Sequence, residues 1–125
     1  MNPNTMTLDE CRDWLAVATG YWLEACDCDT CTIVGNGMLQ CWRKAGDSIR
    51  YHEHPIPPTL DAAASAMPEG WDWRRVGGEY LGGNKVNGGG IVTRASVTDT
   101  DDEKLDRARL AVACRMAAKK EPNRE

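Results

Sequence analysis

The chain has 125 residues, of which 42% are hydrophobic and 27% charged; this composition fits one folded domain and excludes a disordered protein. With a net charge of -4, the chain is not expected to have the basic surface that non-specific nucleic-acid binding needs. No apolar run is long enough to cross a membrane, and the first residues do not resemble a signal peptide. We therefore expect a cytosolic protein whose six cysteines are free thiols or metal ligands.

The first half of the sequence predicts one helix followed by strands. Thr7 and Glu10 are spaced as a capping box, and apolar residues at helical spacing continue to Gly20, which suits a helix end. Strands are expected at residues 21–25, 38–44 and 48–53. The first two would form a cysteine-rich hairpin, residues 26–44, that turns at Gly35-Asn36-Gly37.

The second half predicts two more helices around further strands. A stiff connector with three prolines, residues 55–58, leads to Thr59, a good N-cap for a short helix. Strands are expected at residues 71–76, 79–81 and 91–97, with a glycine-rich loop at 82–90. A second capping box at residues 100–103 would open the last helix and would explain the acidic run there. The tail, residues 121–125, is expected to be disordered.

These elements predict an α+β fold. The hairpin-like turns favour a mainly antiparallel sheet, and three helices should cover it in a layered α/β/α sandwich. We expect residues 1–120 to form a single domain that includes the cysteine-rich hairpin.

Residues 55–116 resemble a family of small viral proteins. The letters that carry the resemblance are PPTLDAAA at residues 57–64, MPEGW at 67–71 and DRARLA at 106–111, with a Gly-rich hairpin between the last two. This order is similar to the phage ABA sandwich family of phage and prophage proteins. The resemblance implies a viral accessory protein with a layered α/β/α domain and implies no catalytic residues. The cysteine-rich segment, residues 26–41, lies outside the family pattern.

The cysteines of the hairpin could bind a metal ion. Cys28 and Cys31 have the spacing of a zinc knuckle, and Cys41 on the returning strand could join them. The fourth ligand would be Cys26, His52 or His54. The candidate ligand set is Cys26, Cys28, Cys31 and Cys41. Zinc there would be structural, because no His and Glu pair stands beside it to activate water. The alternative is a group of reduced thiols, with Cys41 buried as a small hydrophobic side chain.

Catalytic signals are weak. His52 and His54 would point the same way on a strand and could serve a metal or phosphodiester site; alternatively they lie in an exposed linker. No nucleophile is paired with a base in a known motif, and the glycine-rich loop lacks the P-loop pattern. A hydrolase that uses the two histidines is therefore less favoured than a protein that is not an enzyme.

Aromatic and basic residues surround the glycine-rich loop. Aromatic rings can stack on a nucleobase, Arg can grip phosphate, and glycine lets the backbone approach a ligand closely. The candidate ligand-binding residues are Trp71, Trp73, Arg74, Arg75, Tyr80, Lys85 and Arg94. Alternatively, Trp71 and Trp73 belong to the core and the basic side chains are ordinary solvated positions.

Two functions fit these patterns. The first hypothesis is a phage-encoded accessory protein, not an enzyme, that counters host defence by binding and sequestering a small nucleotide-type signal. A pocket between subunits, and hence a homo-oligomer, would suit it. The alternative is a zinc-stabilised protein-interaction module that inhibits a host protein.

Overall fold

The computed structural model describes residues 2–35, 39–86 and 88–120. After a short 3-10 turn, η1 (Pro3–Thr5), the elements are α1 (Leu8–Ala18), β1 (Tyr21–Ala25), α2 (Asp29–Gly35), β2 (Gln40–Lys44), α3 (Leu60–Ser65), β3 (Trp71–Val76), β4 (Glu79–Lys85), β5 (Ile91–Thr98) and α4 (Glu103–Lys120). The predicted α+β class is confirmed, since all strand pairs are antiparallel. Among the described residues, no helix has both the length and the apolar character needed to cross a membrane.

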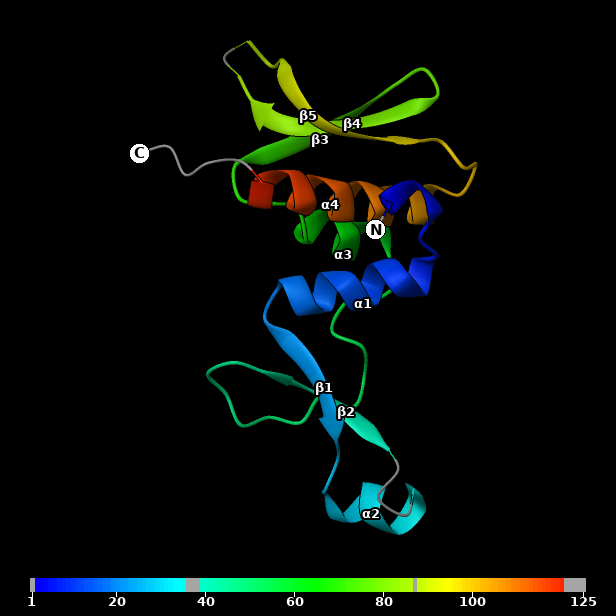
Figure 1. Cartoon of the computed structure of the whole chain (residues 1–125), viewed down its shortest axis with the longest axis vertical. Helices are drawn as coiled ribbons and strands as arrows, with labels where there is room; N and C mark the ends of the chain where they lie inside the picture. Colours follow the sequence, from blue (N-terminus) through cyan, green and yellow to red (C-terminus); the bar gives the residue numbers. More distant parts are fainter. Residues whose placement is uncertain (1, 36–38, 87, 121–125) are drawn as a thin grey trace.

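The strands form two sheets, whereas the sequence predicts one. β1 pairs with β2, and β3, β4 and β5 form a separate three-stranded sheet. The expected strand at residues 48–53 is reduced to a single bridge between Trp42 and Tyr51, so it does not join the two sheets. Helices α1, α3 and α4 consequently lie between the sheets, and no described helix covers the outer face of the three-stranded one (Figure 1). The helices thus form the middle of the molecule instead of the two outer layers of an α/β/α sandwich.

α4 is the centre of the packing because it is buried on two faces. Ala111 and Val112 belong to the main core, which α1 and α3 complete. Leu110 and Cys114 pack against the three-stranded sheet around the buried ring of Tyr80. Helical spacing in the sequence predicts only one inner face, so it misses the second.

Of the two capping boxes predicted from the sequence, the structure confirms the one at α1 but not the one at α4. Thr7 Oγ1 accepts the backbone N–H of Glu10 at 3.2 Å, and Glu10 Oε1 accepts the N–H of Thr7 at 2.9 Å, which confirms the first capping box. At α4, Asp102 Oδ1 accepts the N–H groups of the next turn at 3.1 and 3.3 Å, so Asp102 caps this helix and not Thr100. The acidic run nevertheless opens a helix, as predicted.

The glycine-rich segment is mostly strand. β4 continues to Lys85, so Gly82 and Gly83 lie inside it and not in a loop. A Cβ atom at Gly82 would collide with Cys114 Sγ of α4, and one at Gly83 would collide with the Val92 carbonyl beside a β-bulge. These two glycines therefore serve close packing, which the sequence pattern alone does not distinguish from loop flexibility.

The cysteine-rich hairpin ends in a helix. α2 lies at the far end of the β1–β2 pair, remote from the three-stranded sheet (Figure 1). Within the described ranges it is a fourth α-helix beyond the three expected, and its seven residues carry no amphipathic pattern that would have revealed it. Residues 36–38, which include most of the predicted turn, and the predicted tail, residues 121–125, lie outside the described residues. We call the segment from Cys26 to Gly35, together with Gln40 and Cys41 at the start of β2, the tip.

Candidate metal centre

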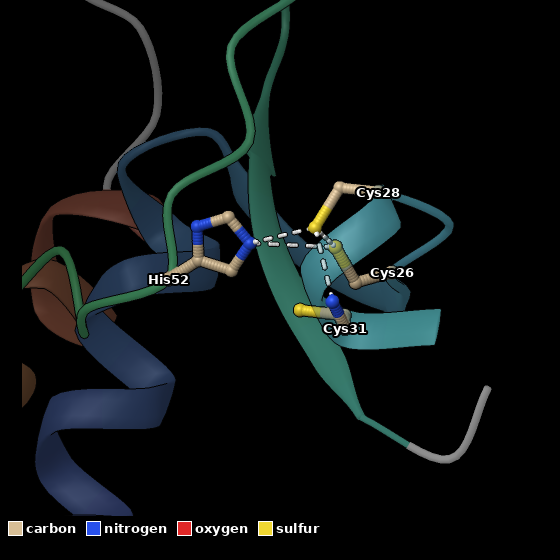
Figure 2. A group of neighbouring side chains, drawn as sticks. All are labelled: Cys26, Cys28, Cys31 and His52. Carbon is tan, nitrogen blue, oxygen red and sulfur yellow. Dashed lines mark hydrogen bonds between the residues drawn. The ribbon is translucent and has the colours of Figure 1, made fainter. Parts of the chain in front are cut away.

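Three cysteines and one histidine converge at the tip. One ligand atom each from Cys26, Cys28, Cys31 and His52 lies within 4.8 Å of the other three. Figure 2 shows the His52 ring facing the three cysteines, with its Nε2 atom 3.4 Å from Cys26 Sγ and 3.5 Å from Cys28 Sγ. The Sγ atoms of Cys26 and Cys28 are 3.4 Å apart.

The separations among Cys26, Cys28 and His52 fit the geometry of a tetrahedral zinc site, and the Cys31 sulfur lies within 4.8 Å of these three atoms. With Zn–S bonds of about 2.3 Å and Zn–N bonds of about 2.0 Å, sulfur and nitrogen ligands lie about 3.5 Å apart and two sulfurs about 3.8 Å apart. The distances from His52 to the sulfurs match this value, and the two sulfurs would need to separate by only a few tenths of an ångström. The donor set of three thiols and one imidazole is one of the common structural zinc sets.

Backbone structure positions each of these side chains. Cys26 follows β1 directly, and its N–H donates to the Leu39 carbonyl at 2.8 Å, which extends the hairpin by one pair. Cys31 lies in the first turn of α2, and its N–H donates to Cys28 Sγ at 3.5 Å, which holds the Cys28 side chain against the helix start. His52 is fixed by its neighbour Tyr51, whose backbone exchanges two hydrogen bonds with β2.

Because the thiols are close together, the pKa values of Cys26 and Cys31 shift in opposite directions. A hydrogen bond from the Cys28 backbone lowers the pKa of the Cys26 thiol below its ordinary value. Hydrogen bonds with Cys28 and Cys26 raise the pKa of Cys31 to about 12. One thiolate is thus favourable in this group, but a second or third places like charges side by side. A divalent cation would offset that repulsion and would replace the protons.

Cys41 is a neighbour of the four converging residues but is not one of them. Its side chain is 1% exposed and packs with Cys26 and Cys31. The set that the structure brings together therefore differs from the predicted ligand set in one member, with His52 in place of Cys41. The sequence offers a histidine as an alternative ligand but contains nothing that selects His52.

The chain matched no family model, no curated protein and no solved structure. The resemblance of residues 55–116 to the phage ABA sandwich family accordingly stays a prediction. A metal-binding role for the tip is therefore argued from its ligand atoms and the distances between them, and not from any relative.

The second histidine belongs to a different contact. His54 Nε2 lies 2.7 Å from Asp13 Oδ1 of α1, and His54 Nδ1 accepts the backbone N–H of Ile56 at 3.0 Å. Through Nε2, His54 attaches the segment between β2 and α3, residues 45–59, to α1, while its Nδ1 bond is local to that segment; we call these residues the connector. The paired-histidine site considered from the sequence is not formed, because the strand that would have aligned His52 with His54 is absent.

The aromatic residues predicted to bind a ligand are largely packed. The Tyr80 ring is 2% exposed, and the Trp73 ring stacks on it with 5.8 Å between centroids. Arg107 of α4 lies over Trp73 at 3.8 Å from the ring centroid, and Trp71 packs against the same cluster. These contacts correspond to the core alternative, although nucleotide binding itself stays an untested prediction.

The basic candidates lie at exposed positions of the three-stranded sheet. They are Arg74, Arg75, Lys85 and Arg94. Arg75 forms an ion pair with Asp99, Lys85 Nζ lies 3.9 Å from Asp72 Oδ2, and Arg94 donates to an asparagine side chain at 3.3 Å. Three of the four are thus engaged within the sheet region.

A groove lies elsewhere, with a volume of about 910 Å³. Trp14 and Val17 of α1 form part of its lining, together with Arg115 and Lys119 of α4. None of the predicted ligand-binding residues contributes to it, so this groove was not predicted from the sequence.

Proposed function

We propose that the protein is a metal-stabilised protein-interaction module. A structural zinc ion would be bound by Cys26, Cys28, Cys31 and His52, and it would hold the tip in a form that contacts a partner protein. The observation that carries the proposal is the convergence of three sulfur atoms and one imidazole nitrogen within 4.8 Å.

The tip needs such a crosslink because it has almost no apolar core of its own. Its buried cluster consists of cysteine side chains. The large apolar side chains of α2, Ile33 and Val34, are 80% and 76% exposed and do not contribute to it. A helix of seven residues is far too short to be stable in isolation. Binding of structural zinc to a peptide site supplies about 10–16 kcal/mol, which is ample to order this segment.

The chemistry of the site favours a structural role. The chain supplies all four ligands that zinc prefers, so no position stays open for water or a substrate. When bound, the metal would polarise nothing and would act as a crosslink between α2, the end of β1 and the connector. A catalytic zinc, in contrast, keeps a position free.

The exposed side chains of α2 support an interaction role. Ile33 and Val34 are adjacent on a helix at the extremity of the molecule, where a partner could reach them (Figure 1). Fixing two apolar side chains in place before binding reduces the entropy lost on association. If the resemblance to phage proteins holds, the partner would be a host protein that this surface inhibits.

The proposal is tested by native mass spectrometry and by partner capture. We expect one zinc ion per chain, lost in a Cys28→Ser/Cys31→Ser variant and retained in His54→Gln, the matched control for a histidine outside the centre. Capture of one defined partner should require both bound zinc and the Ile33 and Val34 side chains. A wild-type chain without metal after purification with zinc present would refute the proposal, as would capture unaffected by Ile33→Asp/Val34→Asp.

A further inference from the structure

Five potential ligands, four cysteines in the tip and His52 beside it, surround a site for a metal that takes four. Beside the converging set, Cys41 is 1% exposed, interacts with the Cys26 side chain and belongs to the same buried cluster as Cys31. Buried free cysteines are common as small hydrophobic side chains, but such a thiol next to three others is also a potential metal ligand.

The pairing of β1 and β2 explains why Cys41 lies there. The Cys26 N–H donates to the Leu39 carbonyl, so Cys26 lies opposite Leu39, and Cys41 is two residues farther along β2. Residues two apart on a strand face the same side, and diagonal neighbours across an antiparallel pair are within reach of each other. Cys41 therefore stays beside Cys26 as long as the hairpin is intact.

His52 is attached in a different way. The four cysteines lie on β1, α2 and β2 or directly beside them, whereas His52 belongs to the connector between β2 and α3. The connector is joined to β2 by the Tyr51–Trp42 bridge and by the contact between the Trp42 and His54 rings, and to the tip by an exposed ion pair between Arg50 and Asp27. The His52 side chain is solvent-exposed while Cys41 is buried, so His52 is the ligand that can leave without disturbing the hairpin.

We propose that Cys41 is a reserve ligand, which replaces His52 on the metal when the connector moves away from the tip. In this exchange the bond between the metal and His52 Nε2 breaks, a bond between the metal and Cys41 Sγ forms, and the Cys41 proton passes to water. The inference rests on the proposed metal centre and adds a second state to it. Metal would then stabilise the tip in both states, but only the His52 state fastens the connector.

The identity of the metal should shift the balance between the two states. Soft metal ions favour thiolate over imidazole, so Cd²⁺ should populate the four-sulfur state more than Zn²⁺ or Co²⁺ does. Release of the connector should speed trypsin cleavage after Arg50 while the metal stays bound, because the exposed ion pair of Arg50 with Asp27 does little by itself to hold this backbone in place.

A double-mutant cycle in the full chain tests the assignment, with Co²⁺ as a spectroscopic probe and ¹¹³Cd²⁺ as an NMR probe. We expect Cys41→Ala to leave the three-sulfur, one-nitrogen Co²⁺ spectrum unchanged. His52→Ala should still bind one metal ion, now with a four-sulfur spectrum and faster trypsin cleavage at Arg50. The double variant should lose at least about tenfold more affinity than the two single losses combined.

The outcomes separate this inference from the proposed function. Wild-type protein that binds no metal would overturn both. Metal bound by the wild type with three sulfurs, together with equal affinity and spectrum for His52→Ala and the double variant, would overturn only the reserve role of Cys41. Loss of one sulfur ligand in Cys41→Ala alone would show that Cys41 is a permanent ligand and would also overturn it. Cys41→Ser, which keeps the side-chain size, checks that cavity formation does not mimic these effects.

Discussion

The substitution Gly82→Ala tests the close packing of α4 against the three-stranded sheet. The added Cβ atom would collide with Cys114 Sγ and would lie 3.4 Å from Leu110 Cδ1, both on α4. Both partners are fully buried, so the helix or the sheet must move. Overpacking of this kind costs about 1–3 kcal/mol. Loss of unfolded-state freedom on replacing glycine offsets about 0.4–1 kcal/mol of it.

A second substitution makes the test specific. Cys114→Ala removes the sulfur that the new Cβ would meet, so Gly82→Ala/Cys114→Ala should be more stable than the two single losses predict, by about 1–2 kcal/mol. Gly78→Ala is the matched control, because a Cβ there meets nothing within 4 Å. Urea unfolding followed by far-UV circular dichroism measures all four variants. Additive losses, or a Gly82→Ala protein as stable as the wild type, would show that Gly82 is not a packing glycine.

Three further predictions concern the other assignments. Trp73→Ala should cost about 2–4 kcal/mol in urea unfolding, because the ring packs between Tyr80 and Arg107; a variant of unchanged stability that loses nucleotide-induced thermal stabilisation would instead restore the ligand-site interpretation. Asp13→Asn should lower stability by at most about 1 kcal/mol and leave the metal content unchanged, since its contact with His54 is partly exposed; loss of metal on elemental analysis would contradict the separation of the two histidines. Burial raises the pKa of Cys11 to about 11 and that of Cys114 to about 12, so both should resist iodoacetamide in the folded protein while the tip cysteines react after chelation, as counted by mass spectrometry. The stability gained by keeping these two thiols protonated is complete below their ordinary pKa and falls as the pH rises towards 11; stability that rose over that range would refute the assignment.

The parts of the fold that depend on near neighbours in the sequence could be predicted. The Thr7 capping box and the Thr59 N-cap are each decided within four residues, and both form as expected. The spacing of Cys28 and Cys31 likewise indicates a metal-binding turn without knowledge of the rest of the chain. Each of these patterns brings its own atoms together, so the surrounding fold has little influence on it.

The parts that depend on distant contacts could not be predicted. His52 lies near the cysteines because the neighbouring Tyr51 forms a bridge to Trp42. A single bridge has no local sequence pattern from which it could be predicted. The burial of Gly82 likewise depends on where α4 crosses the sheet. The observed order of layers differs from the predicted one for the same reason, because residues 48–53 form one bridge and not a strand. In each case the sequence contains the right residue, but the partner lies far along the chain.

The distribution of buried side chains implies that the two parts of the molecule respond differently to loss of metal. The rest of the molecule, which we call the body, has two apolar clusters that share α4, so the body should fold without any ion. The tip has a cluster of cysteines only, so chelation should unfold it locally while the body stays intact. A surface on α2 that exists only with metal bound could then be switched off without denaturing the protein. His52 lies on the connector that leads to α3. Binding of the ion would therefore couple the folding of the tip to the position of the connector against the body.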